Sequence, residues 1–134
     1  MKTRIRLLRV NDYPQVREIW QESFTLHSTD SLENFKEFIR RNPGLSFVEE
    51  YENKVIAVAL GSYNGRIGYI CRLAVKKEFR NKGIAARLNK AVEAALEKIK
   101  AKQVFLYCHQ NLAKFYLDLG YRTEDDCVVM IKDL

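Results

Sequence analysis

The chain has 134 residues, of which 47% are hydrophobic and 30% charged, with a formal net charge of +6 at pH 7. This length predicts a single domain over residues 1–134, and the positive charge indicates an acidic partner. No apolar run approaches the roughly 18 residues of a membrane span, and Lys2, Arg4 and Arg6 interrupt any signal peptide, so we expect a soluble, cytoplasmic protein without a membrane partner.

The first third of the chain predicts a strand followed by two helices. Residues 4–9 alternate partly between apolar and charged side chains and predict a strand. Asp12 and Gln15 have the spacing of a capping box at the start of a helix that runs to Phe24. A second, short helix is predicted over residues 32–39.

Strands dominate the middle of the chain. Residues 45–51 and 55–63 are strand-like runs separated by a short turn, which predicts a hairpin. Residues 69–75 are rich in strand formers, and the apolar positions from Ile84 to Ile99 then recur at the helical period. The order is therefore strand, loop, long helix.

The last third predicts a strand over residues 103–108, and the preceding helix is a crossover long enough for parallel pairing. Residues 112–119 predict a short helix, and residues 121–123 and 128–132 predict two closing strands. We therefore expect an α/β domain built on a mixed sheet.

A basic turn joins the strand 69–75 to the long helix, and it reads Arg80-Asn81-Lys82-Gly83-Ile84-Ala85. The first turn of a helix has unpaired N–H groups and a partial positive charge, to which Arg80 and Lys82 add. Gly83 lets an anion approach the backbone, so the turn predicts a phosphate site. In the alternative interpretation, Gly83 relieves strain and the cations form a solvated rim. Neither a nucleoside-triphosphate loop nor a dinucleotide-binding motif is present.

Two motifs in this sequence resemble those of the GNAT superfamily of N-acetyltransferases. Leu73-Ala74-Val75, followed by the turn from Arg80 to Ala85, resembles the acetyl-CoA pyrophosphate loop, whose pattern is Arg/Gln-x-x-Gly-x-Gly/Ala. The run from Asn111 to Tyr121 resembles the second motif, an Asn before a short helix reading Phe-Tyr-x-x-Leu-Gly-Phe/Tyr. The resemblance covers almost the whole chain, although the Asn-to-Tyr spacing is shorter than in the commonest version.

The resemblance implies that family's fold, a mostly antiparallel mixed sheet flanked by helices, in which two central parallel strands splay apart. It implies acetyl-CoA as cosubstrate without a metal. It also implies acetyl transfer, by direct attack on the thioester, to a primary amine of a small molecule or to a peptide N-terminus or lysine. A homodimer is a further expectation, because small domains of this family are frequent dimers.

The resemblance also indicates which residues contact the cofactor. The pantetheine arm would pair with Leu73, Ala74 and Val75, while the pyrophosphate would bind Arg80, Asn81, Lys82, Gly83, Ile84 and Ala85.

Asn111 and Tyr116 would also contact the cofactor, and Tyr116 is the candidate acid. Ordinary pKa values of about 10 for tyrosine and 8.5 for a thiol make full proton transfer uphill by roughly 2 kcal/mol, so a hydrogen bond to the leaving thiolate is the expected role. In the alternative interpretation Tyr116 is a core residue and Asn111 a helix cap.

No base is evident on the central strand, where Cys71-Arg72 stands in the place at which many relatives carry a Glu. We therefore expect the proton to leave through water to Glu49, Glu50 or His109, or the acceptor to be an amine of low pKa. Because Glu49 and Glu50 are successive strand residues, they point to opposite faces and only one of them can reach the site.

Two rival functions remain open. One is a module that binds an acyl-CoA or another phosphorylated ligand without turnover. The other is nucleic-acid binding, which is disfavoured because the sequence has no helix-turn-helix and no interleaved aromatic and basic residues. The three cysteines, Cys71, Cys108 and Cys127, contain no Cys-x-x-Cys pair and are interpreted as small buried hydrophobes of a reducing compartment.

Overall fold

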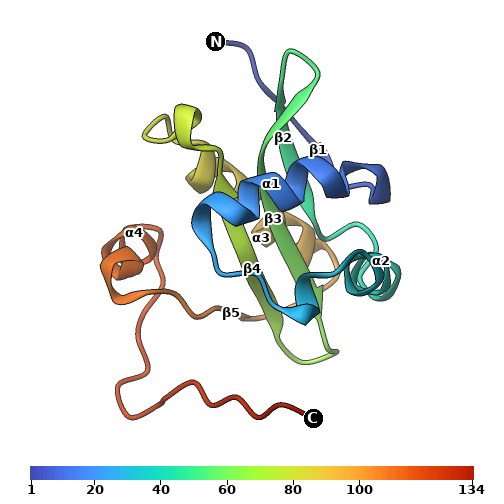
Figure 1. Cartoon of the computed structure of the whole chain (residues 1–134). Coiled ribbons are helices and arrows are strands. Elements are labelled where there is room, and N and C mark those ends of the chain that lie inside the picture. The colour runs from blue at the N-terminus through green and yellow to red at the C-terminus, as the bar shows by residue number, and fades with distance from the viewer.

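The computed structural model describes all residues, Met1–Leu134, and contains a five-stranded sheet in the order β1-β2-β3-β4-β5 (Figure 1). The strands are β1 (Arg4–Leu7), β2 (Phe47–Tyr51), β3 (Lys54–Tyr63), β4 (Gly68–Val75) and β5 (Val104–Phe105). The α-helices are α1 (Tyr13–Ser23), α2 (Leu32–Arg41), α3 (Ile84–Lys98) and α4 (Ala113–Asp118). Short 3-10 turns occur at η1 (Val10–Asp12), η2 (Ser28–Asp30), η3 (Lys77–Phe79) and η4 (Gln110–Leu112). All neighbouring strands are antiparallel except β4 and β5, which confirms the expected mixed sheet.

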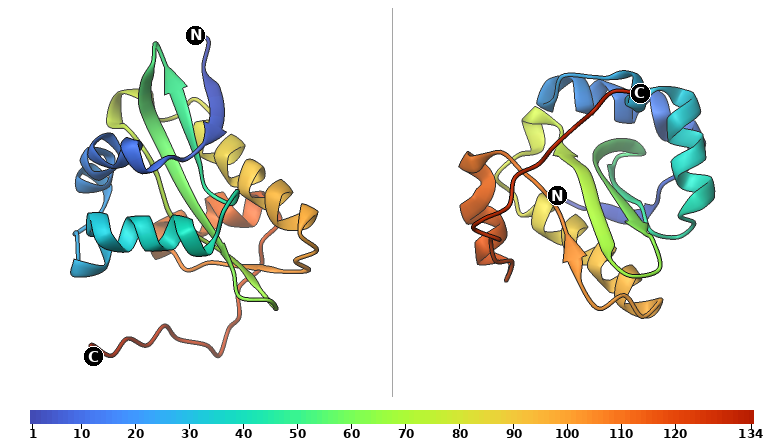
Figure 2. Two further views of the ribbon diagram at one scale, coloured as in Figure 1. Left: turned by 90° about the vertical axis from the view of Figure 1, so that its right-hand side faces the viewer. Right: turned by 90° about the horizontal axis from the view of Figure 1, so that it is seen from below.

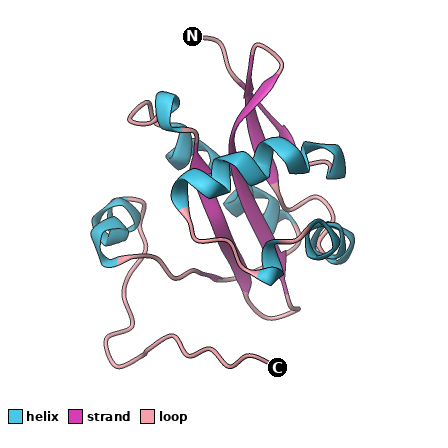
Figure 3. Cartoon of the chain, in the orientation of Figure 1, coloured by secondary structure: helices cyan, strands magenta, loops and turns pink.

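Helices cover both faces of the sheet, with α1 and α2 on one face and α3 on the other (Figures 2 and 3). The central strand β3 is buried on both sides, as its nearly continuous apolar sequence requires. Val58 and Leu60 pack in the cluster under α1 and α2, whereas Ala57 and Ala59 pack under α3. The helical period of α3 supplies the opposing side chains, which are Ile84, Leu88, Val92 and Leu96. This frame holds β4, the strand that precedes the basic turn.

Strands β4 and β5 touch only at their beginnings, where Gly68 pairs with Val104 and Tyr69 with Phe105. Beyond this point β5 ends, while β4 continues to Val75 with no neighbouring strand on that side. The register of β4 against β3 also shifts near Arg72, whose φ of +52° is left-handed. The parallel pair is therefore splayed, as expected, and a bulged strand edge is open along the second half of β4.

The two predicted closing strands are wrong for the single chain. Residues 121–123 and 128–132 form no strand, and after α4 the chain runs away from the sheet as an extended tail (Figures 1 and 2). The predicted strand 103–108 is reduced to the two residues of β5. Because β5 is so short, it gives a closing strand of the same chain little to pair with.

Two local interpretations also need correction. Asp12 and Gln15 form no capping box, because Asp12 accepts hydrogen bonds from the Arg6 guanidinium and the Arg9 N–H, and Gln15 Oε1 accepts from the Val55 N–H at 2.9 Å. Asp12 thus ties η1 to the neighbouring β1, and only Gln15 joins elements distant in sequence, α1 and β3.

The prediction that the cysteines are buried is wrong for Cys108 and Cys127, the two nearest the end of the chain. Cys71 is partly covered, and burial raises the pKa of its thiol to about 11. Cys108 and Cys127 are exposed, since neither lies in an element that faces the core. No helix of the structure is both long and apolar enough to cross a bilayer.

Candidate active site

The basic turn presents an uncapped helix start. Gly83 is the N-cap of α3 with φ +80° and ψ 8°, and no side chain hydrogen-bonds to the first turn, which also lacks an acidic residue. Asn81 is left-handed as well, with φ +63°. A Cβ built on Gly83 would meet only Arg87 Nη1, at 3.5 Å. The N–H groups and dipole of α3 are therefore left for an external anion.

The cations of this turn have different positions. Arg80 donates from Nε to the Val75 carbonyl at 2.9 Å and from Nη2 to Ser23 Oγ at 3.1 Å, so it ties the turn to β4 and α1. Lys82 is exposed, and its carbonyl accepts from Arg87 Nη1 at 3.3 Å. Arg80 therefore fixes the turn in place, whereas the ammonium group of Lys82 has no salt-bridge partner.

Arg87 connects the turn to a carboxylate inside the protein. Its Nη2 donates to Glu49 Oε2 at 2.7 Å, and Glu49, which projects from β2, is fully buried. The second oxygen, Glu49 Oε1, has no hydrogen-bond partner. Because an unpaired buried charge is costly, this ion pair fixes the first turn of α3 to the sheet.

The three expected bases are not brought together. Glu49 faces α3, whereas Glu50 points to the opposite face, where hydrogen bonds from Arg6 and Arg4 hold its pKa below the usual range. His109 is exposed at the start of η4, on the other side of β4. Both glutamates thus form ion pairs with arginines. Of the three candidate bases, only His109 has no such partner.

Helix α4 carries the second motif. The Tyr116 ring packs edge-on against Phe115 and against Tyr121, with ring centroids 4.9 and 5.7 Å away. The Tyr116 hydroxyl makes no hydrogen bond to Tyr121, whose own hydroxyl donates to Glu93. Burial, with the thiol group of Cys108 as a second cause, raises the pKa of Tyr116 to about 12. Asn111 lies in η4, is exposed, and does not cap α4, whose N-cap is Leu112. Both residues therefore keep a polar group for a ligand.

Tyr121, the last residue of the second motif, fixes this helix through contacts that the sequence did not reveal. Tyr121 donates to Glu93 Oε2 at 2.6 Å and accepts from Asn89 Nδ2 at 3.0 Å, both on α3. Burial, followed by the hydrogen bond to Glu93, raises the pKa of Tyr121. Since the rings of Tyr121 and Tyr116 are in contact, this network sets the position of Tyr116 relative to α3.

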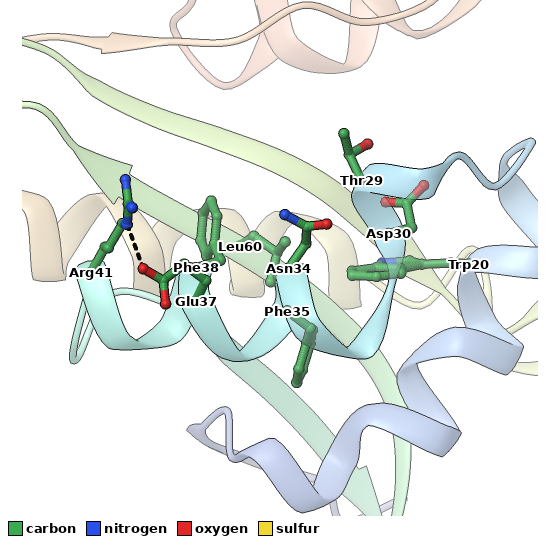
Figure 4. Close-up of a pocket in the computed structure, with 9 residues that line it drawn as sticks. All are labelled: Trp20, Thr29, Asp30, Asn34, Phe35, Glu37, Phe38, Arg41 and Leu60. Carbon is green, nitrogen blue, oxygen red and sulfur yellow. Dashed lines mark hydrogen bonds and ion pairs between the residues drawn. The ribbon is translucent and has the colours of Figure 1, made fainter. Parts of the chain in front are cut away.

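A cavity of about 380 Å³ lies between α2, η2 and β3 (Figure 4). Its lining residues are Trp20, Thr29, Asp30, Asn34, Phe35, Glu37, Phe38, Arg41 and Leu60. Both carboxylates are paired: Asp30 with Arg72 at 2.7 Å and Glu37 with Arg41 at 2.9 Å. The cavity therefore combines an aromatic floor with neutralised charges.

Arg72 couples this cavity to the open edge of β4. Its carbonyl accepts from Trp20 Nε1 at 3.2 Å, and its guanidinium stacks 4.6 Å from the centroid of Phe24 while it pairs with Asp30. These contacts hold the left-handed bulge of β4 in place. Arg72 and Asp30 are 42 residues apart, so no local pattern could have predicted the pair.

The fold is thus an α/β domain in which an uncapped, basic helix start, a place suited to an anion, follows a strand with an open, bulged edge. A family model described as the acetyltransferase (GNAT) family matches residues 13–121, and the chain belongs to this family. The residues of both motifs lie within the match.

Individual relatives agree with this assignment. An acetyltransferase from Photorhabdus laumondii is 32% identical over 123 residues, which cover 90% of this chain and 86% of the relative. An uncharacterised N-acetyltransferase from Methanocaldococcus jannaschii is 30% identical over 143 residues, covering 96% and 90%. In fold, the chain is similar to the PaiA N-acetyltransferase of Thermoplasma acidophilum, solved in complex with coenzyme A, with a TM-score of 0.82, 19% identity, and coverage of 95% and 94%.

Proposed function

We propose that this chain transfers the acetyl group of acetyl-CoA to a primary amine, which attacks the thioester directly. The observation that carries the proposal is the uncapped start of α3 at Gly83, which the short turn η3 connects to the open edge of β4. Its N–H groups suit the pyrophosphate of coenzyme A, and the turn from Arg80 to Ala85 surrounds it. The complex of a fold neighbour with coenzyme A supports this cosubstrate.

The pantetheine arm would lie along Leu73, Ala74 and Val75 as an added strand, because β5 does not cover this part of β4. A backbone N–H of this edge would also donate to the thioester oxygen as it gains negative charge. Asn111 would contact the arm from the other side. Contacts along β4 and at the start of α3 would together hold the thioester in one orientation.

Tyr116 would donate a hydrogen bond to the departing thiolate. With a pKa of about 12 it stays protonated at neutral pH. Complete transfer of its proton to an ordinary thiolate of pKa about 8.5 would be uphill by roughly 5 kcal/mol. The proton that finally neutralises the thiolate therefore comes from the acylated amine, and Tyr116 stabilises charge without being consumed.

The amine would approach from the cavity below α2, where Trp20 and Phe38 offer an apolar surface. Its proton would leave through water, with His109 as the free candidate base. The alternative is an amine that is partly neutral by itself. Deprotonation at pH 7 costs roughly 4.6 kcal/mol for a lysine-type amine of pKa about 10.4, but only about 1 kcal/mol for an amine of pKa about 7.8.

A panel of amines with acetyl-CoA tests the proposal through the release of free thiol. We expect turnover with at least one amine, faster for peptide α-amines than for lysine-type amines at pH 7. For a lysine-type amine the rate should rise about tenfold per pH unit up to its pKa, because only the neutral form attacks. Tight binding of coenzyme A without thiol release from any amine would instead favour the non-catalytic binding module.

A Tyr116→Phe variant tests the role of the phenol. It should lower kcat by about 10- to 100-fold and leave acetyl-CoA affinity nearly unchanged, because the ring stays and only the hydroxyl is lost. The wild-type rate should not fall between pH 9 and pH 10 from ionisation of this group, since its pKa is raised to about 12. Tyr107→Phe, which removes an exposed hydroxyl from the same segment, is the matched control. Equal rates for Tyr116→Phe and Tyr107→Phe would show that Tyr116 only packs against its neighbours.

A further inference from the structure

The cavity of about 380 Å³ between α2, η2 and β3 has two ends of different chemistry (Figure 4). At one end, Asp30 forms an ion pair with Arg72 of β4, and Trp20 donates to the Arg72 carbonyl. Arg72 directly precedes Leu73, where the thioester arm would pair. Arg41, the last residue of α2, lies at the other end. An amine would therefore react at the first end, and the rest of the acceptor would extend toward the second.

Arg41 presents a cation that the protein itself uses only in part. Glu37 accepts two hydrogen bonds from the Arg40 guanidinium and one, at 2.9 Å, from Arg41 Nε. Two positive charges therefore face one carboxylate. The Nη groups of Arg41 make no hydrogen bond, and its side chain is 69% exposed. Because a guanidinium has paired N–H donors that match a carboxylate or a phosphate, this end of the cavity suits an anion.

The carboxylates of the cavity leave no partner for a second positive charge on the acceptor. Asp30 accepts hydrogen bonds from both Nε and Nη2 of Arg72, and its side chain is buried. Glu37 is shared by two arginines. A second cation on the acceptor would meet Arg41 without a carboxylate to pair with, which is unfavourable in a partly enclosed site. The cavity therefore disfavours polyamines and other polycations.

The distance between the two ends indicates the length of the acceptor. Asn34 lies toward the reactive end of the cavity, and Arg41 follows it by seven residues on the same helix, which is roughly 10 Å at about 1.5 Å per residue (Figure 4). An extended peptide spans about 3.4 Å per residue, so three residues cover this distance. Between the ends, Phe35, Phe38 and Leu60 offer an apolar surface. The cavity thus has a place for an amine, an apolar group and an anion, in that order.

We propose that the acceptor is an extended amine with an anionic group roughly 10 Å from its nitrogen, the separation between the α-amine and the terminal carboxylate of a tripeptide. The anion pairs with the Nη groups of Arg41, and the amine reaches β4 beside Arg72. The inference rests on the acetyl transfer proposed above and names the class of its acceptor. Arg41 determines specificity in this arrangement and takes no part in the chemistry.

Tripeptides that differ only at the far end test the inference. Gly-Phe-Gly with a free carboxylate and its C-terminal amide have the same N-terminal residue, and hence nearly the same amine pKa. The free acid should have a KM about three- to fivefold lower than the amide at similar kcat, as expected of a partly exposed charge pair. Gly-Phe-Arg amide, which carries a cation in place of the anion, should have a higher KM than Gly-Phe-Gly amide.

Two variants of α2 locate the origin of this preference. Arg41→Gln should remove the difference between the free acid and the amide, because glutamine carries no charge to pair with the carboxylate. Lys36→Gln removes an equal charge from an exposed position of the same helix that does not line the cavity, so it should keep the difference. The comparison separates a direct pair with Arg41 from a general effect of positive charge.

Trp20 gives a readout that needs no turnover, because it is the only tryptophan of the chain and lines the cavity. Its fluorescence, titrated with each tripeptide in the presence of coenzyme A, should change at an about three- to fivefold lower concentration of the free acid. If this preference is present but no amine releases thiol, the transfer reaction is wrong and the ligand class holds. Equal affinities for acid and amide, a preference that persists in Arg41→Gln, or a lower KM for Gly-Phe-Arg amide overturns the inference.

Discussion

Gly83→Val should reduce the affinity for coenzyme A by at least about a hundredfold while the protein stays folded. Gly83 has φ +80°, a region that a β-branched residue avoids. Its Cβ position already lies 3.5 Å from Arg87 Nη1, so the γ-carbons of valine would enter the space in front of the helix start. Both effects remove the close approach of a phosphate. Titration calorimetry with coenzyme A measures the loss directly.

Gly65→Val is the matched control for this variant. Gly65 has φ +93° in an exposed turn, and a Cβ built on it meets nothing within 4 Å. The substitution therefore imposes a similar backbone strain far from the basic turn, and thermal unfolding should show comparable destabilisation for both variants. Coenzyme A affinity should stay normal in Gly65→Val. A folded Gly83→Val protein that binds coenzyme A as tightly as wild type would remove the turn from the site.

Arg87→Met should lower the free energy of unfolding by about 3 to 5 kcal/mol, because it leaves the buried carboxylate of Glu49 without its partner. For a domain of this size the melting temperature should fall by roughly 10 to 20 °C. The affinity for coenzyme A should fall as well, since Arg87 also holds the Lys82 carbonyl. Thermal unfolding and calorimetry on the same protein measure the two effects.

Removal of both charges identifies the origin of that loss. Adding Glu49→Leu to Arg87→Met should restore most of the stability, because no buried charge remains. Arg41→Met breaks a pair with Glu37 whose side chains are 69% and 42% exposed, and should leave the free energy of unfolding nearly unchanged. A double variant as unstable as Arg87→Met would show that packing of the arginine stem, and not the charge of Glu49, is responsible.

The double variant also separates two roles of Glu49. If Glu49 only holds α3, turnover measured at saturating acetyl-CoA should be retained in the double variant. If Glu49 also receives the amine proton, turnover and its pH dependence should change even where stability is restored.

Elements with strong local signals could be predicted well. The long helix expected over residues 84–99 is α3, Ile84–Lys98, because its apolar positions repeat over four turns and nothing interrupts them. The basic turn was evident as well, since a glycine between cations before a helix is a local pattern. The end of the chain was predicted least well. Residues 128–132 have strand composition, but a strand also needs a neighbour, which the single chain does not provide.

The sequence by itself determined the order of the elements as far as α4, the two motifs and the family, because periodicity, turn chemistry and motif spacing are local properties of the chain. Only the tertiary structure decided how distant residues are used. It placed Glu49 under Arg87, Asp30 against Arg72 and Tyr121 against α3. Such pairs form because polar side chains that lose water on burial need a hydrogen-bonding partner, and they pair with the nearest one in space. Which partner is nearest depends on sheet register and helix packing, which no short stretch of sequence encodes.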